Sequence, residues 1–159
     1  MQAKEFGDLD GLRMAAEMEK RGGAFYKLAA RVSRAEDARN LLTSLAADEA
    51  IHLQEFSRLY EREAARDEVR HYPSETGAFL AAMAADIAFP EGVVGLKEGI
   101  DNPEAILKSA IQSEEDSIRF YTEVAHATDC EQTARVFNDI ILQEQGHLHR
   151  LQKMLSELT

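Results

Sequence analysis

The sequence predicts an all-α protein, a four-helix bundle made of two helical hairpins. Alanine, leucine and glutamate dominate, strand-like alternation is missing, and prolines occur only at positions 73, 90 and 103. Apolar residues recur at alternating spacings of three and four, which place them on one face of a helix. Residues 12–63 also resemble residues 107–158, at an offset of 95. We therefore expect one two-helix unit to occur twice.

The first hairpin is predicted to consist of helices at about 8–32 and 34–67. The inward positions of the first helix are Leu12, Ala15, Glu19, Gly22, Tyr26 and Ala29. Those of the second are Leu42, Leu45, Glu49, His52, Phe56, Leu59 and Glu63. Ser33 and Glu36 fit a capping box, in which a hydroxyl and a carboxylate satisfy free amides at a helix start. A tight turn between the two helices follows.

The second hairpin repeats this pattern in helices at about 103–127 and 129–158. Its inward positions are Leu107, Ala110, Glu114, Ser117, Tyr121 and Val124, then Phe137, Ile140, Glu144, His147, Leu151, Met154 and Leu158. Asn102 and Pro103 favour a helix start, because proline needs no amide partner at the first helical position. Thr128 with Glu131 predicts a second capping box.

A crossover at about 69–101 has no counterpart in the repeat. It is too long for a simple hairpin connection, so we expect it to run along the length of the bundle. Within it, Gly77 to Phe89 is predicted to form a short apolar helix, followed by a loop from Pro90 to Gly99. This helix either covers the side of the bundle or forms a dimer interface.

Length and charge restrict the class of protein. A chain of 159 residues is expected to form one domain, 1–159. The net charge of -11 disfavours nucleic acid and anionic membranes as partners. Cys130 is the only cysteine, so no internal disulfide or four-cysteine module can form. No signal peptide or membrane span is recognised, and we expect a cytoplasmic protein.

Four of the five histidines follow a glutamate by three residues, so helical phase must decide which pairs matter. The pairs are Glu49/His52, Glu68/His71, Glu123/His126 and Glu144/His147. At about 100° per residue, Glu123 lies on the opposite side of its helix from Glu114. Glu68 is at a helix end, and His149 is off the inward face. We assign those residues to the surface.

The remaining pairs lie on inward faces together with Glu19 and Glu114. Buried carboxylates need partners, and four of them close together could not all ionise without cations. Two divalent metals would balance four negative charges. Carboxylates with one imidazole per metal suit iron, with manganese or zinc as alternatives. The predicted metal ligands are Glu19, Glu49, His52, Glu114, Glu144 and His147, with Glu49 and Glu144 expected to bridge.

Tyr26 and Tyr121 lie two helical turns after Glu19 and Glu114. Each phenol either hydrogen-bonds a bridging carboxylate, or supplies an electron as a catalytic residue, or is an aromatic core residue with its hydroxyl satisfied. The small residues Gly22, Gly23 and Ser117 lie beside the predicted site, where they leave room for a small ligand or permit close packing.

These residues resemble the ferritin-like superfamily and, within it, the rubrerythrin-like di-iron proteins. The resemblance rests on Glu19 with Phe25-Tyr26, Glu49-x-x-His52, and their repeats at 114–121 and 144–147. It implies a di-iron oxidoreductase in which a diferrous centre reacts with hydrogen peroxide or dioxygen, as a peroxidase or ferroxidase. Typical rubrerythrins add a cysteine-bound iron module and an extra glutamate where this chain has Ser117. Electrons would therefore come from a separate donor protein.

Two alternatives stay open. Bacterioferritin-type sites resemble these six ligands, which implies an iron-storage or iron-detoxifying protein. A bundle whose metals only tie the helices together is the second alternative. We expect a homodimer for the enzyme and a 24-subunit shell for storage.

Overall fold

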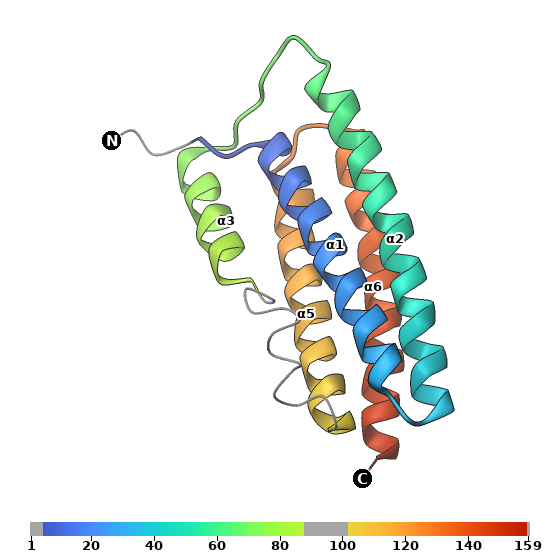
Figure 1. Cartoon of the computed structure of the whole chain (residues 1–159). Coiled ribbons are helices and arrows are strands. Elements are labelled where there is room, and N and C mark those ends of the chain that lie inside the picture. The colour runs from blue at the N-terminus through green and yellow to red at the C-terminus, as the bar shows by residue number, and fades with distance from the viewer. Residues whose placement is uncertain (1–4, 88–101, 159) are drawn as a thin grey trace.

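The computed structural model describes residues 5–87 and 102–158, and it confirms the all-α prediction. Five helices are described (Figure 1): α1 Asp8–Val32, α2 Glu36–Ala64, α3 Ser74–Asp86, α5 Pro103–Ala127 and α6 Glu131–Glu157. Within the described ranges no strand occurs, apart from one isolated bridge between Gly7 and His71. None of the described helices is long and apolar enough to cross a membrane.

The helices α1 and α2 form one hairpin, and α5 and α6 form the other. Each hairpin turns within three residues, 33–35 and 128–130. The end of α2 and the start of α5 lie at opposite ends of the bundle, and α3 lies lengthwise along its side, as expected of the crossover (Figure 1). The predicted loop Pro90–Gly99 and Phe89 lie outside the described residues.

The two predicted capping boxes are wrong, because the hydroxyl groups of Ser33 and Thr128 have other hydrogen-bond partners in the hairpin turns. The Ser33 hydroxyl donates to the Ala29 carbonyl at 2.7 Å, so Ser33 closes α1 and α2 begins only after Ala35. The Thr128 hydroxyl donates to Asp8 at 2.8 Å and accepts from the Cys130 amide at 3.1 Å. The predicted helices 34–67 and 129–158 therefore begin later, at Glu36 and Glu131, and they end earlier than predicted, at Ala64 and Glu157. By contrast, Asn102 caps α5 by accepting from the Ala105 amide at 3.2 Å, with Pro103 first in the helix.

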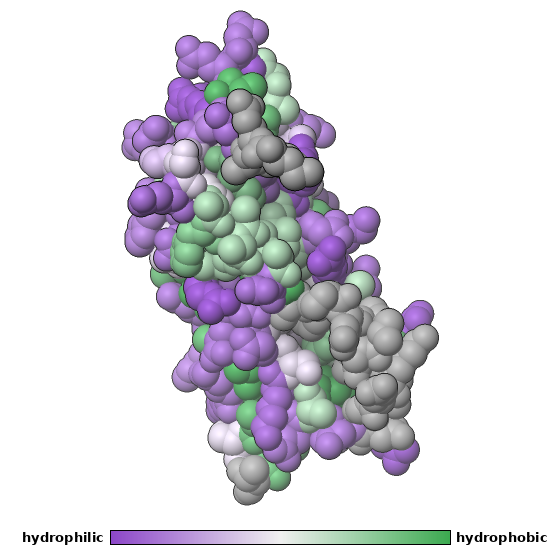
Figure 2. Space-filling model, turned by 90° about the vertical axis from the view of Figure 1, so that its left-hand side faces the viewer, coloured by the Kyte–Doolittle hydropathy of each residue, from purple (hydrophilic) through white to green (hydrophobic). Residues whose placement is uncertain are grey.

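The crossover helix α3 begins three residues earlier than the predicted Gly77, directly after Pro73. Its buried side chains, Leu80 and Met83, join a core cluster that contains Phe120 and Val124 of α5. The prediction that this helix covers the side of the bundle is confirmed. Its outer face carries exposed alanines and Phe79. Figure 2 shows this side of the molecule, with a pale green apolar patch near its centre.

The core is divided into two apolar clusters. One contains Leu12, Ala15, Met18, Phe56, Leu59, Phe120, Tyr121, Phe137 and Ile140, with residues of α3. The other contains Phe25, Tyr26, Leu42, Leu45, Leu107, Ala110 and Leu151. Between the two clusters, each long helix contributes one or two buried glutamate or histidine side chains. Apolar side chains therefore enclose one polar layer from both sides.

Candidate metal centre

Six ionisable side chains form the polar layer, one or two from each long helix. They are Glu19 of α1, Glu49 and His52 of α2, Glu114 of α5, and Glu144 and His147 of α6. Their exposed fractions range from 0% to 5%, so all six are buried. The structure thus brings the six predicted residues together within a single chain, because the heptad-like spacing and the repeat put them at the same height.

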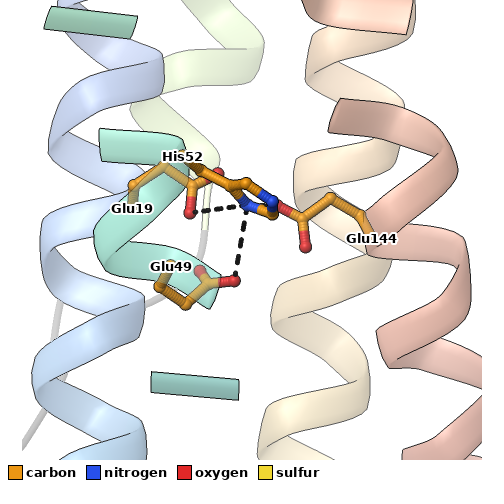
Figure 3. Close-up of side chains that lie close together, drawn as sticks. All are labelled: Glu19, Glu49, His52 and Glu144. Carbon is orange, nitrogen blue, oxygen red and sulfur yellow. Dashed lines mark ion pairs between the residues drawn. The ribbon is translucent and has the colours of Figure 1, made fainter. Parts of the chain in front are cut away.

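One half of the layer surrounds His52 (Figure 3). Its Nδ1 atom lies 3.2 Å from Glu144 Oε1, 3.5 Å from Glu19 Oε2 and 3.9 Å from Glu49 Oε1. The three carboxylates come from three different helices and point toward the same ring nitrogen. This group of four residues has the ligand types and the spacing to hold one metal ion.

The other half surrounds His147. Its Nδ1 atom lies 2.9 Å from Glu144 Oε2, 3.4 Å from Glu49 Oε1 and 3.5 Å from Glu114 Oε1. Glu49 and Glu144 therefore belong to both groups. Glu144 turns one oxygen toward each histidine, which is the arrangement that a bridging carboxylate requires.

Unpaired polar atoms test whether these residues fit a metal. Within the described residues, seven buried side-chain nitrogen or oxygen atoms have no hydrogen-bond partner. Six of them belong to this layer: Glu19 Oε2, Glu49 Oε1, His52 Nδ1, both Glu144 oxygens and His147 Nδ1. Leaving such groups unsatisfied is costly. All six are good ligand atoms for a divalent ion, so the donor set fits two metals.

Without metal, the crowding of buried carboxylates and histidines raises the pKa values of several of these groups. Burial lowers the pKa of His52, but the close carboxylates of Glu144 and Glu19 outweigh this and raise it to about 11. The pKa of His147 rises to about 10 for the same reasons, with Glu114 and Glu144 as partners. Burial and the charge of Glu144 raise the pKa of Glu114 to about 8. Protons would therefore occupy the metal-free layer, and metals would have to displace them.

The two tyrosines approach the layer from opposite sides, Tyr121 from one apolar cluster and Tyr26 from the other. Each one contacts a carboxylate of the other hairpin. The Tyr121 hydroxyl donates to Glu19 Oε1 at 2.7 Å, and the Tyr26 hydroxyl donates to Glu114 Oε1. Burial raises the pKa of both phenols well above 10, with the nearby carboxylates adding to the effect. The phenols thus remain neutral donors. They pair with the two carboxylates expected to be terminal ligands and not with those expected to bridge.

Gly22 does not leave room for a small ligand, because the Glu49 carboxylate fills the space beside it. A Cβ atom at Gly22 would lie 2.7 Å from Glu49 Oε2, closer than side chains approach each other. At Gly23 a Cβ atom would make only an ordinary contact, 3.7 Å from Glu49 Cβ. Ser117, which corresponds to Gly22 in the repeat, is also buried. Gly22 therefore serves the placement of Glu49.

Two residues behind the histidines escaped the sequence reasoning. His147 Nε2 lies 3.0 Å from Asp48 Oδ2, and His52 Nε2 lies 3.0 Å from Gln143 Oε1. Asp48 and Gln143 each precede a shared glutamate, and they too are 95 residues apart. The repeat contains this signal. The sequence does not single out Asp48 and Gln143, because neither lies on the inward face of its helix. Their residue types also differ between the two halves of the repeat.

The residues excluded by helical phase are absent from the layer. Glu68, His71, His126 and His149 are exposed, and Glu123 is partly buried outside the metal-ligating groups. His71 is 3.3 Å from Glu5 in an exposed ion pair at the end of the bundle. Spacing alone would have selected four glutamate and histidine pairs, whereas phase retained the two that meet.

Fold and site together define a class of protein, a ferritin-like helical bundle with a buried layer of carboxylates and imidazoles. Residues 105–159 match a family model described as rubrerythrin. This match contains Glu114, Glu144 and His147, so it covers the half of the layer contributed by the second hairpin. No curated protein matched the chain in a sequence search.

Two solved structures are similar to the chain. A hypothetical protein from Pyrococcus furiosus has 18% sequence identity and a TM-score of 0.66, over 93% of this chain and 87% of that one. The bacterioferritin-related protein from Bacteroides fragilis, described as a dodecameric thioferritin, has 22% identity and a TM-score of 0.65, over 94% and 84%. The two folds support the ferritin-like bundle predicted from the sequence, and the family match agrees with the glutamate and histidine residues of its second hairpin.

Proposed function

We propose that the protein is a di-iron oxidoreductase whose ferrous centre reduces hydrogen peroxide or dioxygen. One observation carries the proposal: two overlapping groups of ligand atoms share Glu49 and Glu144, and among the described residues most of these atoms have no hydrogen-bond partner. Four carboxylates balance the charge of two divalent ions. The ligand types favour iron, with manganese or zinc as alternatives.

When bound, two ferrous ions supply one electron each, which together with two protons reduce one hydrogen peroxide molecule to two water molecules. The protein's own part is to hold the ions and control their surroundings. Glu19, Glu114 and the two histidines would be terminal ligands, whereas Glu49 and Glu144 would bridge. Tyr26 and Tyr121 orient the terminal carboxylates as neutral donors. The apolar clusters on both sides keep bulk water away from the layer.

Return of the centre to the ferrous state requires an electron donor. The 159 residues contain one cysteine, Cys130, which is too few for a cysteine-bound iron module within this bundle. We therefore propose that a separate reductant or donor protein supplies the electrons. We also propose that the working assembly is a homodimer.

Anaerobic titration with ferrous iron, followed by mixing with hydrogen peroxide or with oxygen, tests this function. We expect two ferrous ions per chain, and oxidation of both by one equivalent of peroxide, followed by absorbance. Binding of two ions that neither oxidant converts would overturn the oxidoreductase and leave a structural metal site. The relative rates with the two oxidants identify the preferred substrate.

Iron storage is the second candidate, and the fold shared with a protein described as a dodecameric thioferritin favours it. A storage protein would form a closed shell and take up far more than two ions per chain. Molar mass from light scattering, measured with iron uptake, separates the candidates. A dimer saturated by two ions per chain supports the enzyme, and a large shell that accumulates ferric iron supports storage.

A further inference from the structure

Each histidine of the metal centre has a second contact on its outer nitrogen. Both rings turn Nδ1 into the layer and Nε2 toward an oxygen acceptor, Asp48 Oδ2 for His147 and Gln143 Oε1 for His52, at 3.0 Å in each case. With an oxygen acceptor at Nε2, a neutral ring carries its proton there. The lone pair on Nδ1 is then available to a metal.

The two contacts are equivalent by the repeat but differ in chemistry. Asp48 of α2 reaches across to His147 of α6, and Gln143 of α6 reaches back to His52 of α2. A carboxylate accepts a charge-assisted hydrogen bond, which is roughly twice as strong as a bond between neutral groups. It also raises the basicity of the ligated ring, whereas an amide carbonyl does so weakly. The two halves have the same types of metal-ligating side chain, but they differ in the acceptor behind the histidine.

We propose that the two metal positions are unequal, and that the position of Glu114 and His147 binds its metal more tightly than that of Glu19 and His52. Asp48 and Gln143 act as positioning residues that set this order. The inference rests on the metal centre of the proposed function but does not depend on the oxidant.

A neighbouring arginine strengthens the difference. Arg150 lies 3.5 Å from Asp48 Oδ2, so it helps to hold that carboxylate against His147. Both side chains are partly exposed, 43% and 36%, and solvent weakens their mutual attraction. In the first half of the repeat the position of Arg150 is taken by Glu55. The His52 side has no basic residue at this position.

Zinc is a suitable probe, because it is redox-inert and reports binding without turnover. The metal-free protein, labelled with nitrogen-15 in histidine, is titrated with zinc while the ring nitrogens are followed by NMR. Substitutions His52→Gln and His147→Gln assign the two signals. We expect the first equivalent to shift Nδ1 of His147 and the second to shift Nδ1 of His52. Calorimetry should give two affinities that differ by about 10- to 100-fold.

Reciprocal variants test whether the contact causes the order. Gln143→Asp should tighten the weaker position and bring the two affinities together. Asp48→Gln should weaken the tighter position, and the double exchange should reverse the order of filling. Gln145→Asp adds the same charge to an exposed neighbouring position of α6 and should leave the order unchanged. A purely structural role would change unfolding in these variants but not the order of filling.

The failures of the inference and of the proposed function are distinguishable. Equal affinities, simultaneous filling, or an order that the exchanges do not alter would overturn the inference and leave the metal centre intact. If zinc fills the two positions in the expected order, but the iron-loaded protein reacts with neither oxidant, the inference is supported and the oxidoreductase is overturned. A protein that binds no zinc would overturn both.

Discussion

The hydroxyl of Tyr121 donates a hydrogen bond of 2.7 Å to Glu19 Oε1, so a phenol of α5 orients a carboxylate of α1. Tyr26 of α1 orients Glu114 of α5 in the same way. Each predicted terminal ligand is thus held by the opposite hairpin. This cross-pairing makes the geometry of the layer depend on the packing of both hairpins together.

Substitution Tyr121→Phe should leave Glu19 Oε1 unpaired in a buried place and reduce the free energy of unfolding by about 1–3 kcal/mol. Tyr26→Phe should have a similar effect through Glu114. Tyr60→Phe is the matched control, since its hydroxyl meets Arg13 at an exposed contact of 3.1 Å. Chemical unfolding of the three variants measures the difference. Equal losses in all three would show that the phenols do not support the ligands.

Removal of a shared carboxylate should abolish binding of two metals. Glu49→Ala and Glu144→Ala each remove ligand atoms from both groups, whereas Glu123→Ala removes a residue that belongs to neither. Metal content after dialysis measures the effect. The ligand assignment is wrong if all three variants keep the same iron stoichiometry.

Substitution Gly22→Ala should weaken metal binding without destabilising the fold. The new methyl group would displace the end of the flexible Glu49 side chain, which lies 2.7 Å away. In a helix interior, alanine is more favourable than glycine by about 1 kcal/mol, so the metal-free protein should not lose stability. Zinc calorimetry and urea unfolding measure the two effects.

Gly23→Ala provides the control for this prediction. It brings the same helix preference but only an ordinary contact at 3.7 Å. Metal affinity should therefore stay close to that of the unchanged protein. If both alanine variants bind zinc equally well, Gly22 has no special role in the placement of Glu49.

The stability of the metal-free protein should fall as pH rises. The pKa of Glu114 is raised from 4.5 to about 8, so the folded form holds a proton that the unfolded chain releases between these values. The raised pKa of His52 acts in the same direction, since its stabilisation is complete below 6.5 and is lost as pH rises through about 11. Zinc should reverse the trend, because metal and protons compete for the same atoms.

Urea unfolding between pH 5.5 and 9, with a chelator and with excess zinc, checks this prediction. The stabilisation by zinc should increase steadily across the range. A gain from zinc that is independent of pH would contradict displacement of protons from the layer.

Helical phase and the repeat were enough to predict the fold class and the residues that form the buried layer. Glu49 and His52 lie one turn apart on a face whose adjacent turns carry apolar residues, and Glu144 with His147 repeats this. Such short-range periodicity is a property of the chain itself. The same reasoning failed at Ser33 and Thr128, because their hydroxyls had alternative partners in Ala29 and Asp8.

Tertiary structure alone decided which side chains meet across the bundle. Tyr26 pairs with Glu114, and Asp48 with His147, over sequence separations of 88 and 99 residues. Periodicity gives the direction of a side chain from its own helix axis but not the rotation and height of the neighbouring helices. The rotation and height of neighbouring helices depend on how the two apolar clusters pack. This packing brings His147 against the carboxylate of Asp48 and His52 against the amide of Gln143.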